Sequence, residues 1–136
     1  MNYRETIRKY FTDDEGNYIL GVDEGITPEK LLKACNLPFD QETAEGRERI
    51  NRARIELNAF MTKLLFEGYC GGSTGRSPTI YFIARNKAER KMMLAKTAKN
   101  LIGRLHNAMI RGKGLIPELP IKRTQKMLSP FIPQEK

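Results

Sequence analysis

Apolar residues recur mostly at three- and four-residue spacing in this chain, which is typical of amphipathic helices. The longest such pattern predicts a helix over residues 44–66. Its apolar stripe consists of Ile50, Ala53, Leu57, Phe60, Met61, Leu64 and Leu65. Ile55 falls on the opposite, polar side, which points to contact with a partner or with a neighbouring loop.

Two short helices are predicted before this long one. Residues 4–11 carry apolar positions at helical spacing, and residues 28–35 form the second helix. Thr27 suits the N-cap position, and Pro28 suits the first helical position, where a missing N–H costs nothing. Asn36 is expected to end this helix.

A second long helix is predicted over residues 87–111, with Asn86 as its N-cap and Glu89 three residues later. Such a helix is about 38 Å long, which exceeds what a small domain needs. Its apolar stripe fits either packing within the chain or a homodimer, and the excess length favours the dimer. The candidate dimer interface is Leu94, Ala98, Leu101, Leu105 and Ala108.

The remaining pattern predicts short strands and an extended end. Residues 18–22 form a strand candidate between the first two helices. Residues 69–70 and 79–84 read as the strands of a β-hairpin, joined by the glycine-rich loop 71–77. The proline-containing segment 113–136 is expected to be an extended arm with one helical turn near residues 124–128.

The predicted order is therefore helix, strand, helix, helix, strand, strand, followed by a long helix. The strongest local similarity lies in the basic helix that ends in Leu64–Tyr69 and leads into the glycine-rich β-hairpin. This pattern resembles the winged-helix family of DNA-binding domains. The resemblance implies a mainly α fold with a small β-hairpin, in which residues 1–85 form the DNA-binding domain. Residues 86–112 would then be an added dimerisation helix, and 113–136 an extended tail.

The net charge of +8 is unevenly distributed along the chain. Residues 1–48 hold 6 Lys/Arg and 11 Asp/Glu, whereas residues 49–136 hold 18 Lys/Arg and 5 Asp/Glu. Concentrated positive charge attracts the phosphate backbone of nucleic acids. A basic protein with solvated lysines and no nucleic-acid role remains the plainer alternative.

The resemblance implies that helix 44–66 enters the major groove while the wing, residues 71–77, contacts the backbone. Arg and Asn side chains on one helix face suit guanine and adenine edges, and hydroxyls with an arginine suit phosphates. A solvated helix face with the ion pairs Glu48–Arg52 and Arg52–Glu56 is the alternative. The candidate DNA-binding residues are Arg47, Arg49, Asn51, Arg52, Asn58 and Lys63 on the helix, Ser73, Thr74, Arg76 and Ser77 in the wing, and Arg85 and Lys87 after it.

Other kinds of site find little support in the sequence. Gly71 and Gly75 are separated by three residues rather than four, and Arg76 stands where a Walker loop needs lysine. One histidine and two cysteines give no zinc-like cluster, and no catalytic constellation is recognisable. We therefore expect no enzyme, no cofactor and no metal.

Double-stranded DNA is the expected partner, with the chain acting as a transcriptional regulator or a replication or partition accessory protein. The expected form is a homodimer with no membrane segment, no secretory signal, a cytoplasmic, nucleoid-associated location, and a protein contact through the C-terminal arm. The alternative is a winged-helix adaptor that binds proteins without touching DNA. RNA binding ranks lower, since no aromatic stacking pattern is present.

Overall fold

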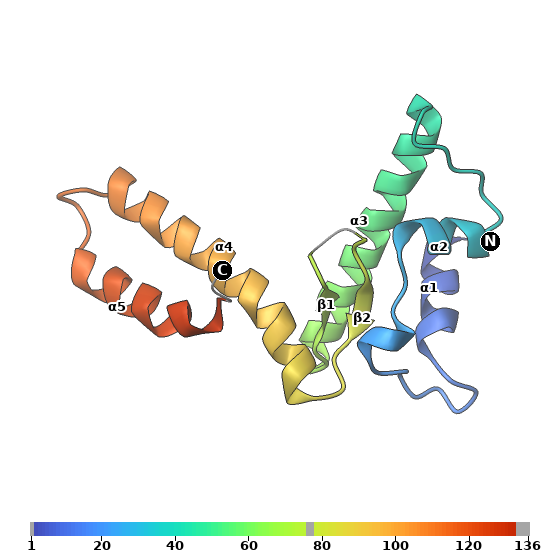
Figure 1. The fold of residues 1–136 in the computed structure, drawn as a ribbon, viewed down its shortest axis with the longest axis horizontal. Coiled ribbons are helices and arrows are strands. Elements are labelled where there is room, and N and C mark those ends of the chain that lie inside the picture. The colour runs from blue at the N-terminus through green and yellow to red at the C-terminus, as the bar shows by residue number, and fades with distance from the viewer. Residues whose placement is uncertain (1, 76–77, 133–136) are drawn as a thin grey trace. The chain divides into compact units, whose positions relative to one another are not determined.

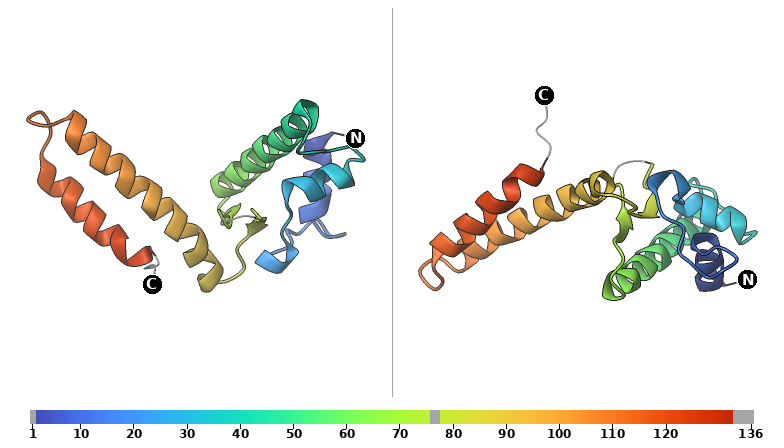
Figure 2. Two further views of the ribbon diagram at one scale, coloured as in Figure 1. Left: turned by 45° about the horizontal axis from the view of Figure 1, so that its top comes forward. Right: turned by 90° about the horizontal axis from the view of Figure 1, so that it is seen from below.

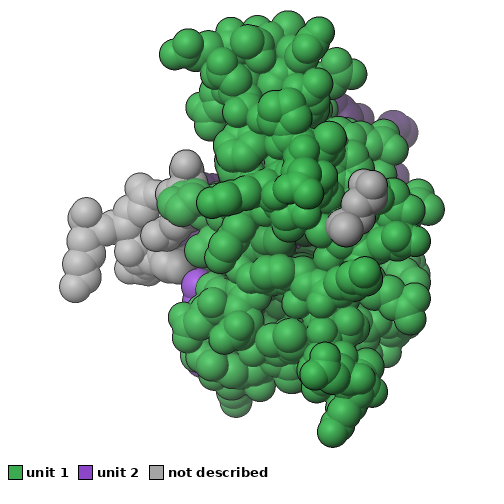
Figure 3. Space-filling view, turned by 90° about the vertical axis from the view of Figure 1, so that its right-hand side faces the viewer, with its two compact units in different colours: residues 1–90 green, residues 91–136 purple. Residues whose placement is uncertain are grey.

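The computed structural model describes residues 2–75 and 78–132 (Figure 1). The protein is mainly helical with one two-stranded antiparallel sheet, as the sequence predicted. Its elements are α1 (Tyr3–Phe11), the 3-10 turn η1 (Val22–Glu24), α2 (Pro28–Ala34), α3 (Ala44–Phe66), β1 (Gly71–Ser73), β2 (Tyr81–Ile83), α4 (Lys87–Arg111), α5 (Glu118–Leu128) and the 3-10 turn η2 (Ser129–Phe131). The chain divides into two compact units, residues 1–90 and 91–136 (Figure 3).

The predicted helix starts are confirmed by their caps. The Thr27 hydroxyl accepts the N–H of Lys30 at 3.2 Å, and the Thr43 hydroxyl accepts the N–H of Gly46 at 3.0 Å. α2 ends where Asn36 takes a positive φ of 57°, a conformation that Asn tolerates better than most residues. Both long helices, α3 and α4, have the predicted bounds.

The first unit is built around α3. In Figures 1 and 2, α1 and α2 lie on one side of this helix, and the β-hairpin runs back along its C-terminal half. An aromatic chain reinforces the packing, because Phe60 of α3 stacks on Phe11 at 5.6 Å and meets Tyr18 edge-on at 6.4 Å. The largest fully buried side chains are Phe11, Phe82, Ile7, Ile26, Leu31, Leu32, Leu57, Leu64 and Ile83.

β2 has a backbone partner on each of its edges. On one edge β1 pairs with it in the register Gly71↔Ile83, and on the other Ile26 forms an isolated antiparallel bridge to Tyr81. The Ile26 N–H donates to the Tyr81 carbonyl at 2.9 Å, and the Tyr81 N–H donates back at 2.8 Å. Gly25 permits this approach, since a Cβ there would overlap the Ile80 side chain.

Two strand predictions were wrong in position. Residues 18–22 do not form a strand, because Tyr18 makes an isolated bridge to Thr12, Gly21 has a φ of 119°, and the 3-10 turn begins at Val22. The segment between α1 and α2 joins the sheet later, at Ile26. The first hairpin strand is also later than predicted, at Gly71–Ser73 rather than at residues 69–70, so part of the predicted wing loop is strand.

The second unit contains a helical hairpin, by which we mean residues 91–111 of α4 together with α5. The prediction of an extended tail was wrong for residues 118–123, because the helical turn predicted near residues 124–128 is part of the longer helix α5. The Gln125 side-chain amide donates to the Ile102 carbonyl at 3.2 Å and so identifies the facing sides of the two helices. None of the residues of α5, all of which are described, is buried.

Candidate nucleic-acid interface

The connection between α2 and α3 is pinned by two of the predicted DNA-binding arginines. Arg47 Nη1 donates to the Gln41 carbonyl at 2.9 Å, and Arg49 Nη1 donates to the Pro38 carbonyl at 3.1 Å. Arg49 also lies 4.0 Å from Glu45. These guanidinium groups therefore tie the N-terminal end of α3 to the loop that precedes it.

Arg52, also predicted to read DNA, is bound to a buried carboxylate. Its Nη2 lies 2.9 Å from Oε1 of Glu56, and Arg4 approaches the other oxygen of the same carboxylate at 3.5 Å. Glu56 is buried, so removal of either arginine would leave a buried negative charge without its full compensation and would destabilise the fold. Of the two i, i+4 ion pairs predicted for a solvated helix face, Arg52–Glu56 is therefore confirmed.

The other polar residues of α3 fall into two groups. Asn51 and Lys63 are exposed to solvent. Asn58 hydrogen-bonds the side chain of Tyr81 on β2, and Arg54 lies close enough to act on the same phenol. Burial raises the pKa of Tyr81, while the Arg54 charge and the Asn58 bond act in the opposite direction. The sequence analysis missed Arg54, although its i, i+4 spacing from Asn58 was a usable signal.

The wing is short and internally bonded where it is described. The Thr74 N–H donates to the Ile80 carbonyl at 3.0 Å, and the Thr74 hydroxyl accepts the N–H of Ile80 at 3.2 Å. Ser73 pairs with Tyr81 in the sheet. Arg76 and Ser77, the other predicted wing contacts, lie outside the described residues.

Arg85 and Lys87 follow the wing. Arg85 forms ion pairs with two carboxylates. Arg85 Nη2 lies 3.7 Å from Asp23 and 3.4 Å from Glu89, and its side chain lies against Gly21. Glu89 accepts the backbone N–H groups of Val22 at 3.0 Å and of Arg85 at 2.9 Å. These two bonds, together with the Arg85 charge, lower the pKa of Glu89. Lys87 is exposed.

α3 also exposes apolar side chains that a DNA reader does not need. Ile55, which falls on the polar side in the sequence pattern, is 49% exposed. Phe66 at the end of the helix is 90% exposed, and Leu65, predicted to belong to the buried stripe, is exposed as well. The sequence pattern did not single out Phe66, because a helix end gives no reliable face.

The predicted dimer residues of α4 differ in exposure. Leu94 and Leu101 are exposed, Leu105 and Ala108 are half-buried, and Ala98 is fully buried within the chain itself. Ala98 therefore packs inside the protomer rather than being available to a second copy. His106 is exposed on the same helix.

Pockets and metal-type clusters add little to this surface. A depression of about 280 Å³ is lined by Tyr3, Glu45, Glu48, Arg49 and Arg52, at the side of α3 near α1. Over residues 2–75 and 78–132, no group of three or more His, Cys, Asp or Glu side chains is placed to hold a metal ion. Among the helices described, none combines the length and apolarity required to span a bilayer.

No family model, no curated protein and no solved structure matches this chain.

Proposed function

We propose that this chain is a double-stranded DNA-binding protein of the winged-helix type. The observation that carries the proposal is the Ile26–Tyr81 bridge. It joins the segment between α1 and α2 to the β-hairpin that follows α3, so a bridged residue lies at the place where a winged helix has its first strand. Such a DNA-binding protein would act as a transcriptional regulator or as a replication or partition accessory protein.

In this proposal α3 supplies the base contacts and the wing supplies phosphate contacts. N-terminal residues of a recognition helix usually reach deepest into the major groove. Asn51 is exposed there and carries an amide suited to adenine, and Lys63 suits the backbone farther along α3. Arg47, Arg49 and Arg52 hold the helix and its preceding loop, so their main contribution is to orient Asn51.

We further propose a homodimer formed through the helical hairpin, since dimers read two half-sites with matching symmetry. Leu94 and Leu101 of α4 remain exposed. A second copy therefore has apolar surface on α4 to cover.

The Asn51→Ala variant tests the reading role most cleanly. We expect it to weaken binding to a selected site by about 1–3 kcal/mol and to relax the base preference at one position. Arg52→Ala is a poorer test, because it also removes a partner from buried Glu56. The measurement is fluorescence anisotropy on a site selected from random duplex DNA.

Asn17→Ala is the matched control, since Asn17 is an exposed turn residue outside α3. It should leave both affinity and base preference unchanged. Equal affinity of the wild type and Asn51→Ala for every duplex tested would count against base reading by α3.

A second function is supported by the apolar residues on the exposed side of α3. Ile55 and Phe66 suit a protein partner better than a DNA groove. In this alternative the winged-helix unit is an adaptor. Absence of duplex DNA binding at low salt, together with a partner complex lost on Ile55→Ser or Phe66→Ser, would favour the adaptor.

A further inference from the structure

The division into two units shows where the positive charge of the protein resides. Residues 1–90 hold 14 Lys/Arg and 14 Asp/Glu, so the first unit has no net charge. Residues 91–136 hold 10 Lys/Arg and 2 Asp/Glu, a balance of +8. The entire net charge of the chain therefore lies in the unit that contains the helical hairpin.

The two units also differ in how their charges are neutralised. In the first unit Arg4 and Arg52 flank Glu56, and Arg85 lies between Asp23 and Glu89. In the described part of the second unit, Lys122 pairs with Glu118 at 3.6 Å. Local carboxylates thus compensate the first unit, whereas the second unit has too few of them to do so.

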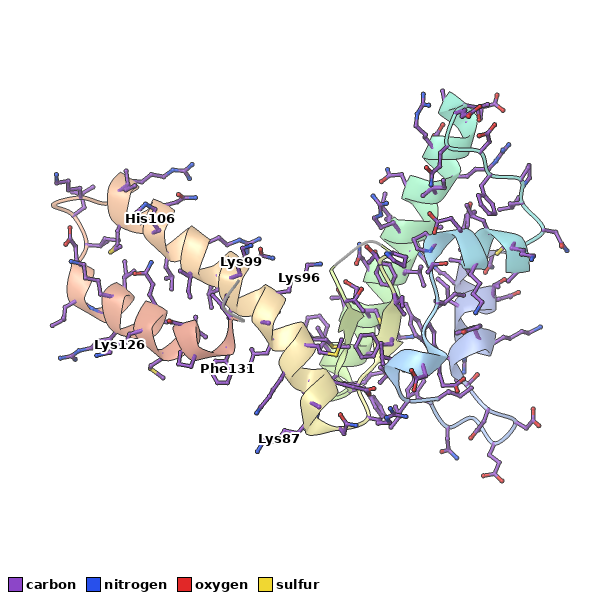
Figure 4. The ribbon with its side chains drawn as sticks, in the orientation of Figure 1. Lys87, Lys96, Lys99, His106, Lys126 and Phe131 are labelled. Atoms are coloured by element: carbon purple, nitrogen blue, oxygen red, sulfur yellow. The ribbon has the colours of Figure 1, made fainter. Side chains whose placement is uncertain are left out.

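Several positive side chains lie on the outer sides of the helical hairpin. The Gln125–Ile102 hydrogen bond marks the inner sides, to which Ala98, Leu105, Ile121 and Leu128 belong by helical spacing. In Figure 4, Lys96 and Lys99 project from the side of α4 turned away from α5, and Lys126 projects from the side of α5 turned away from α4. The exposed basic residues away from the seam include Lys99, Arg104, Arg111, Lys122, Arg123 and Lys126.

We propose that the helical hairpin is a sequence-independent phosphate-binding element that supplies most of the affinity for duplex DNA. This inference rests on the proposed DNA binding and assigns the source of its strength to a unit that the recognition-helix picture leaves out. From Lys96 to Arg111 α4 extends about 22 Å, a length over which duplex DNA carries about 13 negative charges. The neutral first unit then selects the site, and the basic second unit holds the backbone.

A nucleic acid fits this surface better than an anionic membrane does. A membrane-binding helix places a continuous apolar face opposite its basic face. On the outer side of α4 the basic residues are accompanied by Asn100 and Asn107, which can bond phosphate oxygens. On α5 the exposed Leu119 and Met127 are interleaved with Arg123 and Lys126 rather than gathered on a separate face.

The test neutralises three outer residues in the full chain, as Lys99→Gln, Arg104→Gln and Lys126→Gln together. Glutamine has a helix propensity close to that of lysine and arginine, so the helices should persist, which circular dichroism can check. Binding to a labelled random-sequence duplex is measured by fluorescence anisotropy across a salt series. If all three side chains contact phosphates, the slope of log K against log salt should decrease by about 2.7.

The matched control makes the same change of three charges in the first unit, as Lys9→Gln, Lys30→Gln and Lys33→Gln. These residues are exposed on α1 and α2. The control should change the slope by less than one unit, because a contact to phosphate and not total charge sets the slope.

Three outcomes overturn the inference. An equal decrease in both triple variants would show that only net charge matters. An unchanged slope in the helical-hairpin triple variant, while the wild type binds DNA, would refute the helical-hairpin assignment and leave the proposed function standing. Binding of the wild type to anionic but not zwitterionic phospholipid vesicles, with no binding to DNA at any salt, would refute both the inference and the proposed function.

Discussion

Individual residues fix the position of the N-terminal end of α3 in the first unit. Gly46 lies in the first turn of α3 directly against the backbone of Asp40, where a Cβ would overlap main-chain atoms. Asp40 in turn accepts the Glu42 N–H through its side chain at 2.9 Å. Together with the Arg47 and Arg49 bonds to loop carbonyls, this contact converts a long connection into a fixed one.

Replacing Gly46 by alanine should destabilise the protein although alanine favours helices. The overlap is with backbone, which cannot move aside as a flexible side chain can, so we expect a loss of about 1–3 kcal/mol in the free energy of unfolding. Gly103→Ala is the control, because Gly103 lies inside α4 with open space around it. This variant should gain about 0.5–1 kcal/mol in the free energy of unfolding. Urea denaturation measures both, and a stabilised Gly46→Ala would contradict the close contact.

Glu89 makes the stability of the first unit depend on pH. Its pKa is lowered below the ordinary 4.5 by the Val22 and Arg85 N–H groups and by the Arg85 charge. A lowered folded-state pKa means that the carboxylate stabilises the fold above about pH 5 and loses this effect as the pH falls through the lowered value. The Glu89→Gln variant should therefore lose less stability than the wild type between about pH 5 and pH 3. Acid unfolding of the two proteins, followed by circular dichroism, measures this difference. An equal loss of stability in the wild type and in Glu89→Gln would exclude this role of Glu89.

At the scale of elements, helices could be predicted and their partners could not. The caps predicted at Thr27 and Asn86 are local signals, and each one is confirmed by a hydrogen bond. α5 was missed because its prolines indicate an extended chain. Pro117 is its N-cap and Pro120 lies in its first turn, where the absent N–H has no partner to lose.

The helical hairpin should associate through its exposed apolar positions. Leu101→Glu places a charge on the exposed part of the α4 stripe and should shift the protein toward monomer in light scattering, because burying an unpaired carboxylate is costly. Asn100→Glu is the control, because it introduces the same charge one residue away, on the outer side of α4 and outside the apolar stripe. It should leave the molecular mass measured by light scattering unchanged. A monomeric wild type at every concentration would rule out the dimer.

At the scale of the whole molecule, the sequence shows total charge readily and its distribution only once the units are known. A division at residue 48 places positive charge on α3 and everything after it, whereas the structural division after residue 90 leaves the first unit neutral. The Ile26–Tyr81 contact was equally hidden, since no local periodicity specifies which distant residue an isolated bridge will meet. The polar face of α3 and its Arg52–Glu56 pair could be read from the spacing. The burial of Glu56 and the bonds of Arg47 and Arg49 to loop carbonyls could not.

The same bridge constrains the order in which a ribosome can complete this protein. The bridge partner of Ile26 is Tyr81, 55 positions later in the chain. Until Tyr81 has emerged from the ribosome, neither β1 nor Ile26 can pair with β2. Non-local pairing of this kind is slow to form and exposes apolar surface meanwhile. The first unit should thus become protease-resistant in nascent chains only after β2 has left the exit tunnel, by which time much of α4 has been synthesised.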